Sequence, residues 1–303
     1  MSVPAAYLAV VIIWSTTPLG IVWSSETVAP TLAVLLRMII ALIPGWMLLK
    51  IFKVELPWHR SAVILYCYSG LGIFGGMLFS YLAASYISSG LMSLIFGIAP
   101  ILSGVLSKYV LSDEPLSLAK KLALVIALVG LACVCYDRIS LGDQAYLGVI
   151  FILLGVFFFS LSGVLVKSVT VKINPMATTV GALIIAIPLF LLTWFFVDGT
   201  LPYQQWEQRS ILSIIYLGIM GSLVGFVAYF YVLQKLKAST VALITMITPV
   251  IALWIGLMLN NENVSFNIVI GALCIIIGLA VYQWGEWLMK CLMKSRSKFN
   301  NIS

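Results

Sequence analysis

Ten apolar runs of about 20 residues, separated by short polar links, constrain this chain more than any other feature of its sequence. They lie near residues 4–23, 30–51, 61–83, 88–107, 119–137, 145–166, 176–197, 210–233, 239–259 and 267–288. A helix rises about 1.5 Å per residue, so about 20 residues cross a bilayer core about 30 Å thick. The runs lack the alternation of polar and apolar residues that strands of a membrane barrel require. We therefore predict an all-α integral membrane protein with ten transmembrane helices.

The composition supports this class and leaves no room for a soluble domain. Hydrophobic residues make up 62% of the 303 residues and charged residues 9%, whereas a soluble domain carries about 25% charged residues. No polar run is long enough to build a separate domain. The first apolar run follows neither a basic stretch nor a small-residue cleavage site, so we expect it to be retained as a span.

One unit occurs twice in the chain. The first copy contains SGLMSLIFGIAP at 89–100, and the second contains ASTVALITMITP at 238–249. Each is followed by a glutamate and, sixteen residues later, by a glycine in an apolar run: Glu114 and Gly130, then Glu262 and Gly278. Each half holds five runs, an odd number, so the copies are expected to cross the membrane in opposite directions. We predict two inverted five-helix repeats (5+5), 1–140 and 141–290, followed by a basic cytoplasmic tail at 291–303. This architecture is usual in secondary transporters, whose substrate site lies between the halves.

The basic residues predict the orientation of the spans. If the N-terminus is cytoplasmic, the outer links hold only Arg138 and Arg209. The inner links and tail hold Lys50, Lys53, Arg60, Lys108, Lys120, Lys121, Lys167, Lys172, Lys235, Lys237, Lys290, Lys294, Arg296 and Lys298. This bias follows the positive-inside rule, so we expect a multi-pass protein of the inner membrane with both termini cytoplasmic. The net charge of +7 then reports topology and contact with anionic lipid rather than nucleic-acid binding.

Several motifs resemble those of one known family. They are Trp14-Ser15-Thr16-Thr17, Leu36-Arg37-Met38, Ser88 to Pro100, Asp113-Glu114-Pro115, Gly130, Ala238 to Pro249, Glu262 and Gly278. The chain resembles, over essentially its whole length, a ten-helix carrier of the drug/metabolite transporter superfamily with two EamA domains. The resemblance implies a central cavity lined by runs 1–4 and 6–9, with runs 5 and 10 at the periphery. Relatives carry amino acids, nucleobases, nucleotide conjugates, choline-like amines and other metabolites.

We therefore predict a secondary transporter, a permease or exporter that moves a small organic metabolite such as an amino acid by alternating access. Two alternatives remain: an uptake carrier or exchanger for a nucleobase, nucleotide conjugate or choline-like amine, and a non-transporting membrane scaffold. An enzyme is not expected, because the runs hold no His, Asp or Cys cluster at mid-depth. The five cysteines lack metal-ligand spacing, so we expect neither a metal nor a cofactor. The expected partners are a small-molecule substrate and the lipid bilayer, with no nucleic acid, and the chain is expected to be a monomer or weak homodimer.

Arg37 is the ionisable residue that lies well inside a run, and the second half has Ala182 at the equivalent position. A charge near the bilayer centre costs roughly 2.5–3.5 kcal/mol on an insertion scale, so Arg37 must face protein or water. One interpretation is an anchor for a carboxylate or phosphate of the substrate, because the planar guanidinium suits bidentate contacts. The other is a brace that bonds neighbouring backbone carbonyls.

Further candidates are chosen by their predicted depth in the membrane. With Arg37, the substrate cavity is predicted to include Trp14, Thr17, Ser93, Phe96, Phe159, Tyr229, Thr245 and Trp254. For each aromatic ring, ordinary packing between helices is the alternative. Pro18, Pro100 and Pro249 lie inside runs and remove a backbone donor, so they predict kinks that act as hinges or that merely shape the cavity. Glu114 and Glu262 are interpreted as helix-starting carboxylates, favoured by the positive end of a helix dipole.

Overall fold

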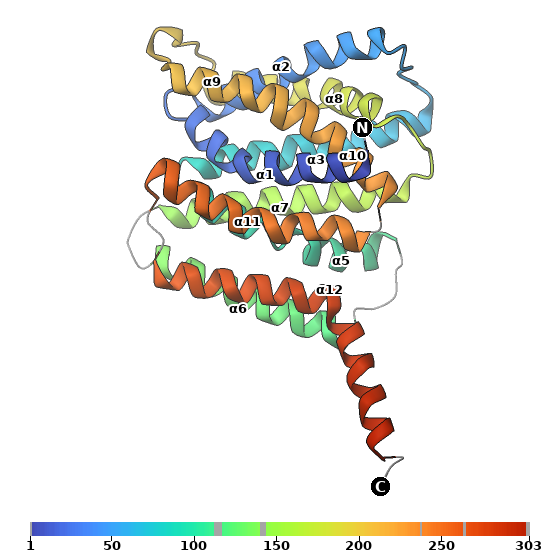
Figure 1. Ribbon diagram of the computed structural model, residues 1–303. Coiled ribbons are helices and arrows are strands. Elements are labelled where there is room, and N and C mark those ends of the chain that lie inside the picture. Colours follow the sequence, from blue (N-terminus) through green and yellow to red (C-terminus); the bar gives the residue numbers. More distant parts are fainter. Residues whose placement is uncertain (1, 112–116, 140–143, 237, 263–264, 301–303) are drawn as a thin grey trace.

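The chain folds into a bundle of helices. The computed structural model describes residues 2–111, 117–139, 144–236, 238–262 and 265–300, and every regular element in these ranges is helical, so the predicted all-α class is confirmed for them. The helices are α1 (Val3–Ser24), α2 (Pro30–Ile51), α3 (Arg60–Ala84), α4 (Ser89–Phe96), α5 (Ala99–Val110), α6 (Leu118–Ile139), α7 (Ala145–Ser168), α8 (Pro175–Val197), η1 (Tyr203–Gln205), α9 (Gln208–Tyr216), η2 (Leu217–Val224), α10 (Gly225–Lys235), α11 (Ala238–Asn260) and α12 (Phe266–Asn300), shown in Figure 1.

Most of these helices have the length and composition of membrane spans. Over the described side chains, eight helical segments are long and apolar enough to cross a membrane: Val3–Ser24, Pro30–Ile51, Arg60–Ala84, Ser89–Val110, Ala145–Ser168, Pro175–Val197, Gln208–Lys235 and Phe266–Gly285. Ile244–Asn260 is a shorter apolar helix. Pro30 and Pro175 begin α2 and α8, where the missing N–H costs no helical hydrogen bond. The total of ten spans in a 5+5 arrangement stays a prediction.

Two of the expected continuous helices are interrupted. The run at 88–107 divides into α4 and α5, and Pro100 lies in the first turn of α5. Proline has no N–H to bond the carbonyl of Phe96, so the helix cannot continue through this point with regular geometry. The run at 210–233 contains η2, a π-helix between α9 and α10. The sequence analysis predicted neither the complete break nor the π-helix.

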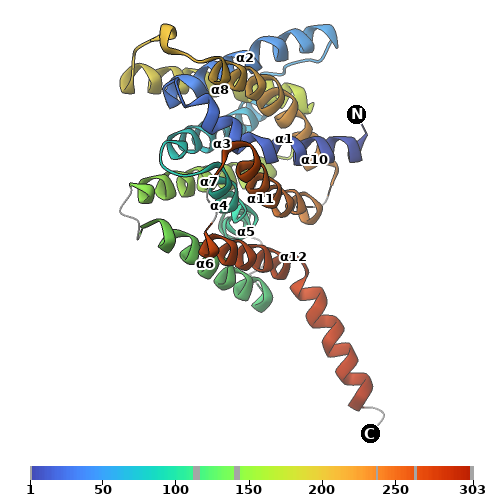
Figure 2. The ribbon, with the colours of Figure 1, turned by 60° about the vertical axis from the view of Figure 1, so that its left-hand side comes forward.

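The packing separates a peripheral helix pair from the rest. Helices α6 and α12 lie side by side at the bottom of Figure 1, and Figure 2 shows the same pair from another side. Their backbones approach closely. A Cβ added to Gly130 would lie only 2.7 Å from the carbonyl oxygen of Gly271. Small residues permit such close contact between helices in a membrane. The C-terminal part of α12 continues beyond the bundle.

The remaining helices form the central body. Helix α1 packs on α9, α10 and α11, whereas α7 packs on α3, α4 and α5. Helix α2 packs on α8, η2 and α9, α3 packs on α8, and α4 packs on α11. Large apolar side chains such as Phe196 (78% exposed) point away from this body, as expected for a surface that faces lipid.

Candidate substrate cavity

A cavity of about 80 Å³ lies inside the central body. Seven of the nine predicted cavity residues line it: Trp14, Thr17, Arg37, Ser93, Phe96, Phe159 and Thr245. Pro18 also lines it, as do residues that the predicted set lacks: Ile21, Met77, Ser80, Met92, Ile152, Gly221, Phe226 and Thr248. The lining comes from α1–α4, α7, η2, α10 and α11, so it draws on both halves of the sequence.

Arg37 brings a buried positive charge to this cavity. Its side chain is 1% exposed, and its Nε donates a hydrogen bond to the hydroxyl of Ser222 in η2 at 2.7 Å. The guanidinium carbon lies 5.9 Å from the centre of the Tyr81 ring. Nη1 is buried and has no hydrogen-bond partner within the described ranges. The contact that positions the guanidinium is thus made with a side-chain hydroxyl rather than with the backbone carbonyls considered in the brace interpretation.

The π-helix η2 supplies the surface on which Arg37 lies. A Cβ on Gly221 would lie 3.0 Å from Nη2 of Arg37, and a Cβ on Gly218 would lie 3.1 Å from the Arg37 carbonyl oxygen and 2.5 Å from Cγ2 of Ile40. A side chain at Gly218 would therefore displace Ile40, and one at Gly221 would press on the guanidinium. Single π turns occur often at functional sites because they re-aim neighbouring groups. Here η2 brings Ser222 and Gly221 against the same guanidinium.

Four aromatic rings form a connected cluster at one end of the cavity. The Trp14 ring lies 5.8 Å from that of Phe159 and 4.9 Å from that of Tyr229, measured between centroids. Phe159 also lies 5.6 Å from Phe96 and 5.9 Å from Tyr229. A second cavity of about 20 Å³ shares Phe159 and Phe226 with the first, and Tyr229 lines this second cavity. We call Trp14, Phe96, Phe159 and Tyr229 the aromatic partition, because their rings pack on one another between the two spaces.

Trp254 is placed differently from the prediction. Its side chain is 60% exposed and is not part of the cavity lining. Trp254 follows Thr245 by nine residues, and at about 100° per residue this separation puts the two on opposite faces of α11. Hydropathy predicts the depth of a residue in the membrane but not the direction in which its side chain points.

Some buried hydroxyls join helices instead of lining the cavity. Ser160 donates to the carbonyl oxygen of Ala99 at 3.2 Å, and Ser162 donates to that of Tyr68 at 2.7 Å, so both tie α7 to helices of the first half. Thr17 does line the cavity, but its hydroxyl donates within its own helix, to the carbonyl oxygen of Ile13 at 2.7 Å. The hydroxyl protons of these three residues are thus engaged by backbone carbonyl oxygens.

Several proline residues lie inside the helices of the central body, and one of them lines the cavity. Pro18 lies inside α1 and Pro249 inside α11, and Pro18 is a lining residue. Pro100 lies beside the break between α4 and α5. Pro44 in α2 and Pro188 in α8 also lie inside helices, and the sequence analysis did not select them. The structure gives their positions, whereas the hinge role of Pro18, Pro100 and Pro249 stays a prediction.

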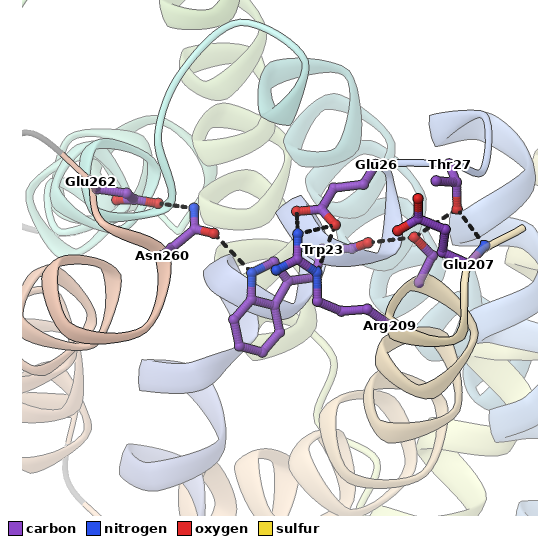
Figure 3. Close-up of polar contacts among 8 residues, drawn as sticks. Trp23, Glu26, Thr27, Glu207, Arg209, Asn260 and Glu262 are labelled. Carbon is purple, nitrogen blue, oxygen red and sulfur yellow. Dashed lines mark hydrogen bonds and ion pairs between the residues drawn. The ribbon is translucent and has the colours of Figure 1, made fainter.

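A network of polar contacts, shown in Figure 3, covers the end of the body where α1 and α11 end. Arg209 forms a two-point ion pair with Glu26, with Nε–Oε2 and Nη2–Oε1 distances of 2.8 and 2.6 Å. Trp23 Nε1 donates to Asn260 Oδ1 at 2.9 Å. Thr27 donates to the Ser210 hydroxyl at 2.9 Å and accepts from the Glu207 amide at 3.0 Å. We call this network, together with Ser89, which bonds Glu262, the polar lock. Its members are Trp23, Glu26, Thr27, Ser89, Glu207, Arg209, Ser210, Asn260 and Glu262.

Glu262 belongs to the same lock. Its carboxylate accepts from the Ser89 amide at 2.9 Å, from the Ser89 hydroxyl at 2.7 Å and from the Gly90 amide at 3.0 Å. It therefore serves the N-terminus of α4, where amides are free and the helix dipole favours an anion. Its place in the sequence predicted that it starts the next helix along the chain, α12. The capped helix is instead one from the other half; Glu114 lies outside the described residues.

Comparison with known proteins decides the family. The model of the EamA-like transporter family matches the chain twice, at residues 3–136 and 146–283. The chain belongs to the EamA-like transporter family. It is 25% identical over 277 residues to the uncharacterized transporter YoaV of Bacillus subtilis (strain 168), with 90% of this chain and 93% of YoaV covered. It is 26% identical over 215 residues to an uncharacterized transporter of Archaeoglobus fulgidus, with 70% of this chain and 75% of the relative covered.

A solved crystal structure has the same fold. Its TM-score to this chain is 0.64 at 18% identity, covering 93% of this chain and 97% of the other. Membership of the EamA-like family and the apolar helices identify a multi-pass membrane protein. Both matched segments contribute residues to the cavity lining. Trp14 and Arg37 belong to the first segment, and Phe159, Phe226 and Thr245 belong to the second.

Proposed function

We propose that this chain is a secondary transporter that moves a small organic metabolite across the inner membrane by alternating access. Its two moving parts are the halves 1–140 and 141–290, each with five spans, inverted relative to each other. The observation that carries this proposal is a cavity lined from both halves of the sequence, in a member of a transporter family. Such a site between inverted repeats is the arrangement on which carriers rely.

The helix packing supports two structurally equivalent halves. If each helix is exchanged for its equivalent in the other half, α1 becomes α7, α2 becomes α8, and α3 becomes the α9–η2–α10 segment. The contacts of α1 with α10 and α11 then become those of α7 with α3 and α5, and both sets are observed. In the α2–α8, α4–α11 and α6–α12 pairs, the two helices are each other's equivalents, so the exchange leaves each pair unchanged. All three pairs are in contact. A pattern with this symmetry is expected of two halves related by a pseudo-two-fold axis.

The cavity is small for a substrate site. Its volume of about 80 Å³ is well below the roughly 300–1,000 Å³ of a pocket that holds a drug-sized ligand. The polar lock lies where α1 and α11 end, and the aromatic partition lies beside the second cavity. Substrate must therefore enter through a movement that parts one of these two barriers. We propose that they are the outer and inner gates respectively.

The charge distribution supports that assignment of sides. Lysine and arginine lie mainly in the links opposite the polar lock, and such links are cytoplasmic in most membrane proteins. The lock then faces outward and both termini face the cytoplasm. Nearly all hydrogen bonds of the lock join one half to the other, so it must open when the halves rock apart on that side.

Transport can be tested before the substrate is identified. Metabolites of cells with and without the protein are profiled, and each differing solute is then tested for counterflow in liposomes that contain the purified protein. A variant without native cysteines, with Glu26→Cys and Arg209→Cys joined by a cleavable bis-maleimide, serves as the control. We expect counterflow of at least one solute, its loss when the lock is cross-linked, and its recovery after cleavage. Absence of counterflow for every differing solute, or undiminished counterflow with the lock cross-linked, would contradict the proposal.

A further inference from the structure

We propose that the cavity selects an organic monoanion, and that Arg37 binds the carboxylate of this substrate through Nη1 and Nη2 while the aromatic and methionine side chains hold its apolar body. This inference rests on the proposed transport function and names the class of its substrate. It is carried by one observation: Arg37 lines the cavity, is only 1% exposed, and has at Nη1 a buried donor that has no hydrogen-bond partner among the described residues.

Arg37 gives the described lining of the cavity its charge. No Asp or Glu occurs among the residues that line it in the described part of the chain. Neither Tyr81 nor Ser222, which lie beside the guanidinium, is a carboxylate. A buried charge without a counter-charge is costly, and in native proteins such charges are paired. The lining therefore carries a single positive charge that an anion of charge −1 would balance.

The contacts of the guanidinium determine the direction in which it can bind. Ser222 uses Nε, so the edge formed by Nη1 and Nη2 keeps its donors. Nη1 is buried without a described partner, and Nη2 lies against the bare backbone of Gly221. A guanidinium edge with two parallel N–H groups matches the two oxygens of a carboxylate. Ser222 thereby fixes the orientation of Arg37 and acts as a positioning residue.

The other lining residues indicate the remainder of the substrate. Trp14, Phe96 and Phe159 present rings to the cavity, and Met77 and Met92 add flexible apolar surface. The described lining has no carboxylate to receive an ammonium group, and the Thr17 hydroxyl is used within its own helix. A substrate with an apolar body and one carboxylate thus fits this lining better than an amine or a zwitterion. The small volume of the cavity favours a short body.

The test compares carboxylates with amides of the same shape. Purified full-length protein in detergent is titrated with isobutyrate and isobutyramide, and with phenylacetate and phenylacetamide, at constant ionic strength. Affinity is measured by calorimetry and by thermal shift. We expect at least one carboxylate to bind about tenfold or more tightly than its amide, because a hydrogen bond to a charged group is worth more than a neutral one. Phenylalanine, the zwitterion, is expected to bind more weakly than phenylacetate.

Variants identify the group responsible for the preference. Arg37→Gln is expected to abolish it, Arg37→Lys to retain a part, and Ser222→Ala to weaken it while the charge remains. Arg60→Gln, which removes an exposed positive charge at the start of α3, is the matched control and should bind like the unmodified protein. If Arg37→Gln does not fold, the test rests on the reduced preference for carboxylate over amide in Arg37→Lys and Ser222→Ala.

Three outcomes would overturn the inference: no binding of either carboxylate, equal binding of carboxylate and amide, or an unchanged preference in a folded Arg37→Lys or Arg37→Gln variant. These outcomes are separable from failure of the transport proposal, since binding in detergent needs no transport. Counterflow of a neutral solute alone would leave the carrier standing and remove the anion site. Arg37-dependent anion binding without counterflow of any solute would support the anion site and contradict the transport proposal.

Discussion

Glu262 Oε1 accepts hydrogen bonds from both the amide and the hydroxyl of Ser89, at 2.9 and 2.7 Å, although 173 residues separate the two in the chain. Glu262 follows α11 in the second half, and Ser89 begins α4 in the first. The carboxylate thus supplies acceptors for a helix start that belongs to the other half. Asn260, which donates to Oε1 at 3.2 Å, links this contact to Trp23 at the end of α1.

This contact predicts a stability effect that depends on the charge of Glu262. Glu262→Gln keeps the size of the side chain but removes the charge that strengthens its hydrogen bonds. We expect a loss of about 1.5–3 kcal/mol, measured as a lower Tm in detergent. Glu207→Gln is the matched control, because Glu207 is exposed and contributes its backbone amide to the lock. Its effect should stay within about 0.5 kcal/mol. Equal effects of the two substitutions would argue against the cap.

The orientation predicts which links can be reached from outside the cell. Single cysteines are placed in a cysteine-free protein at Thr200, after α8, and at Glu55, between α2 and α3. An impermeant maleimide applied to intact cells should label the cysteine at 200 and leave the one at 55 unlabelled until the membrane is opened. Labelling of 55 in intact cells would reverse the orientation and exchange the outer and inner gates.

The interrupted helices predict an effect on the rate of transport rather than on binding. Pro100→Ala and Pro249→Ala restore a backbone donor where the helix is broken or kinked. If these points flex when the halves rock, each variant should fold and bind ligand normally but turn over more slowly. An added barrier of about 1.4 kcal/mol would slow turnover about tenfold. Counterflow rates measured beside ligand affinity check this. Unaltered rates in both folded variants would reduce the prolines to static elements of the cavity wall.

The close contact of α6 and α12 predicts a stability effect remote from the cavity. Gly130→Leu would force a side chain into the space occupied by the Gly271 carbonyl oxygen. Overpacking of this kind costs about 1–3 kcal/mol, so Tm should fall. Val129→Leu, on a side chain that is 52% exposed, is the control and should have little effect. A lower affinity of the cavity for ligand in folded Gly130→Leu would show that the pair is not peripheral.

The sequence predicted the helices well and the cavity only in part. Long apolar runs bounded by prolines such as Pro30 leave few alternatives for helix ends. Arg37 was found because a charge in an apolar run must be accommodated by protein or water. Trp254 was misplaced because depth is encoded in hydropathy, whereas the facing direction depends on which helices pack together. The guanidinium site on η2 was missed because a π-helix has no clear signal in one sequence, although the glycines at 218, 221 and 225 mark the segment.

The central claim is alternating access, and the accessibility of Thr248 tests it most directly. Thr248 lines the cavity and is 7% exposed. Thr248→Cys in a cysteine-free protein is treated with a small impermeant methanethiosulfonate, either on right-side-out or on inside-out membrane vesicles. Alternating access predicts modification from both sides, with modification from the outside lost when positions 26 and 209 are cross-linked. Modification from one side only, or from both sides regardless of the cross-link, would contradict the account.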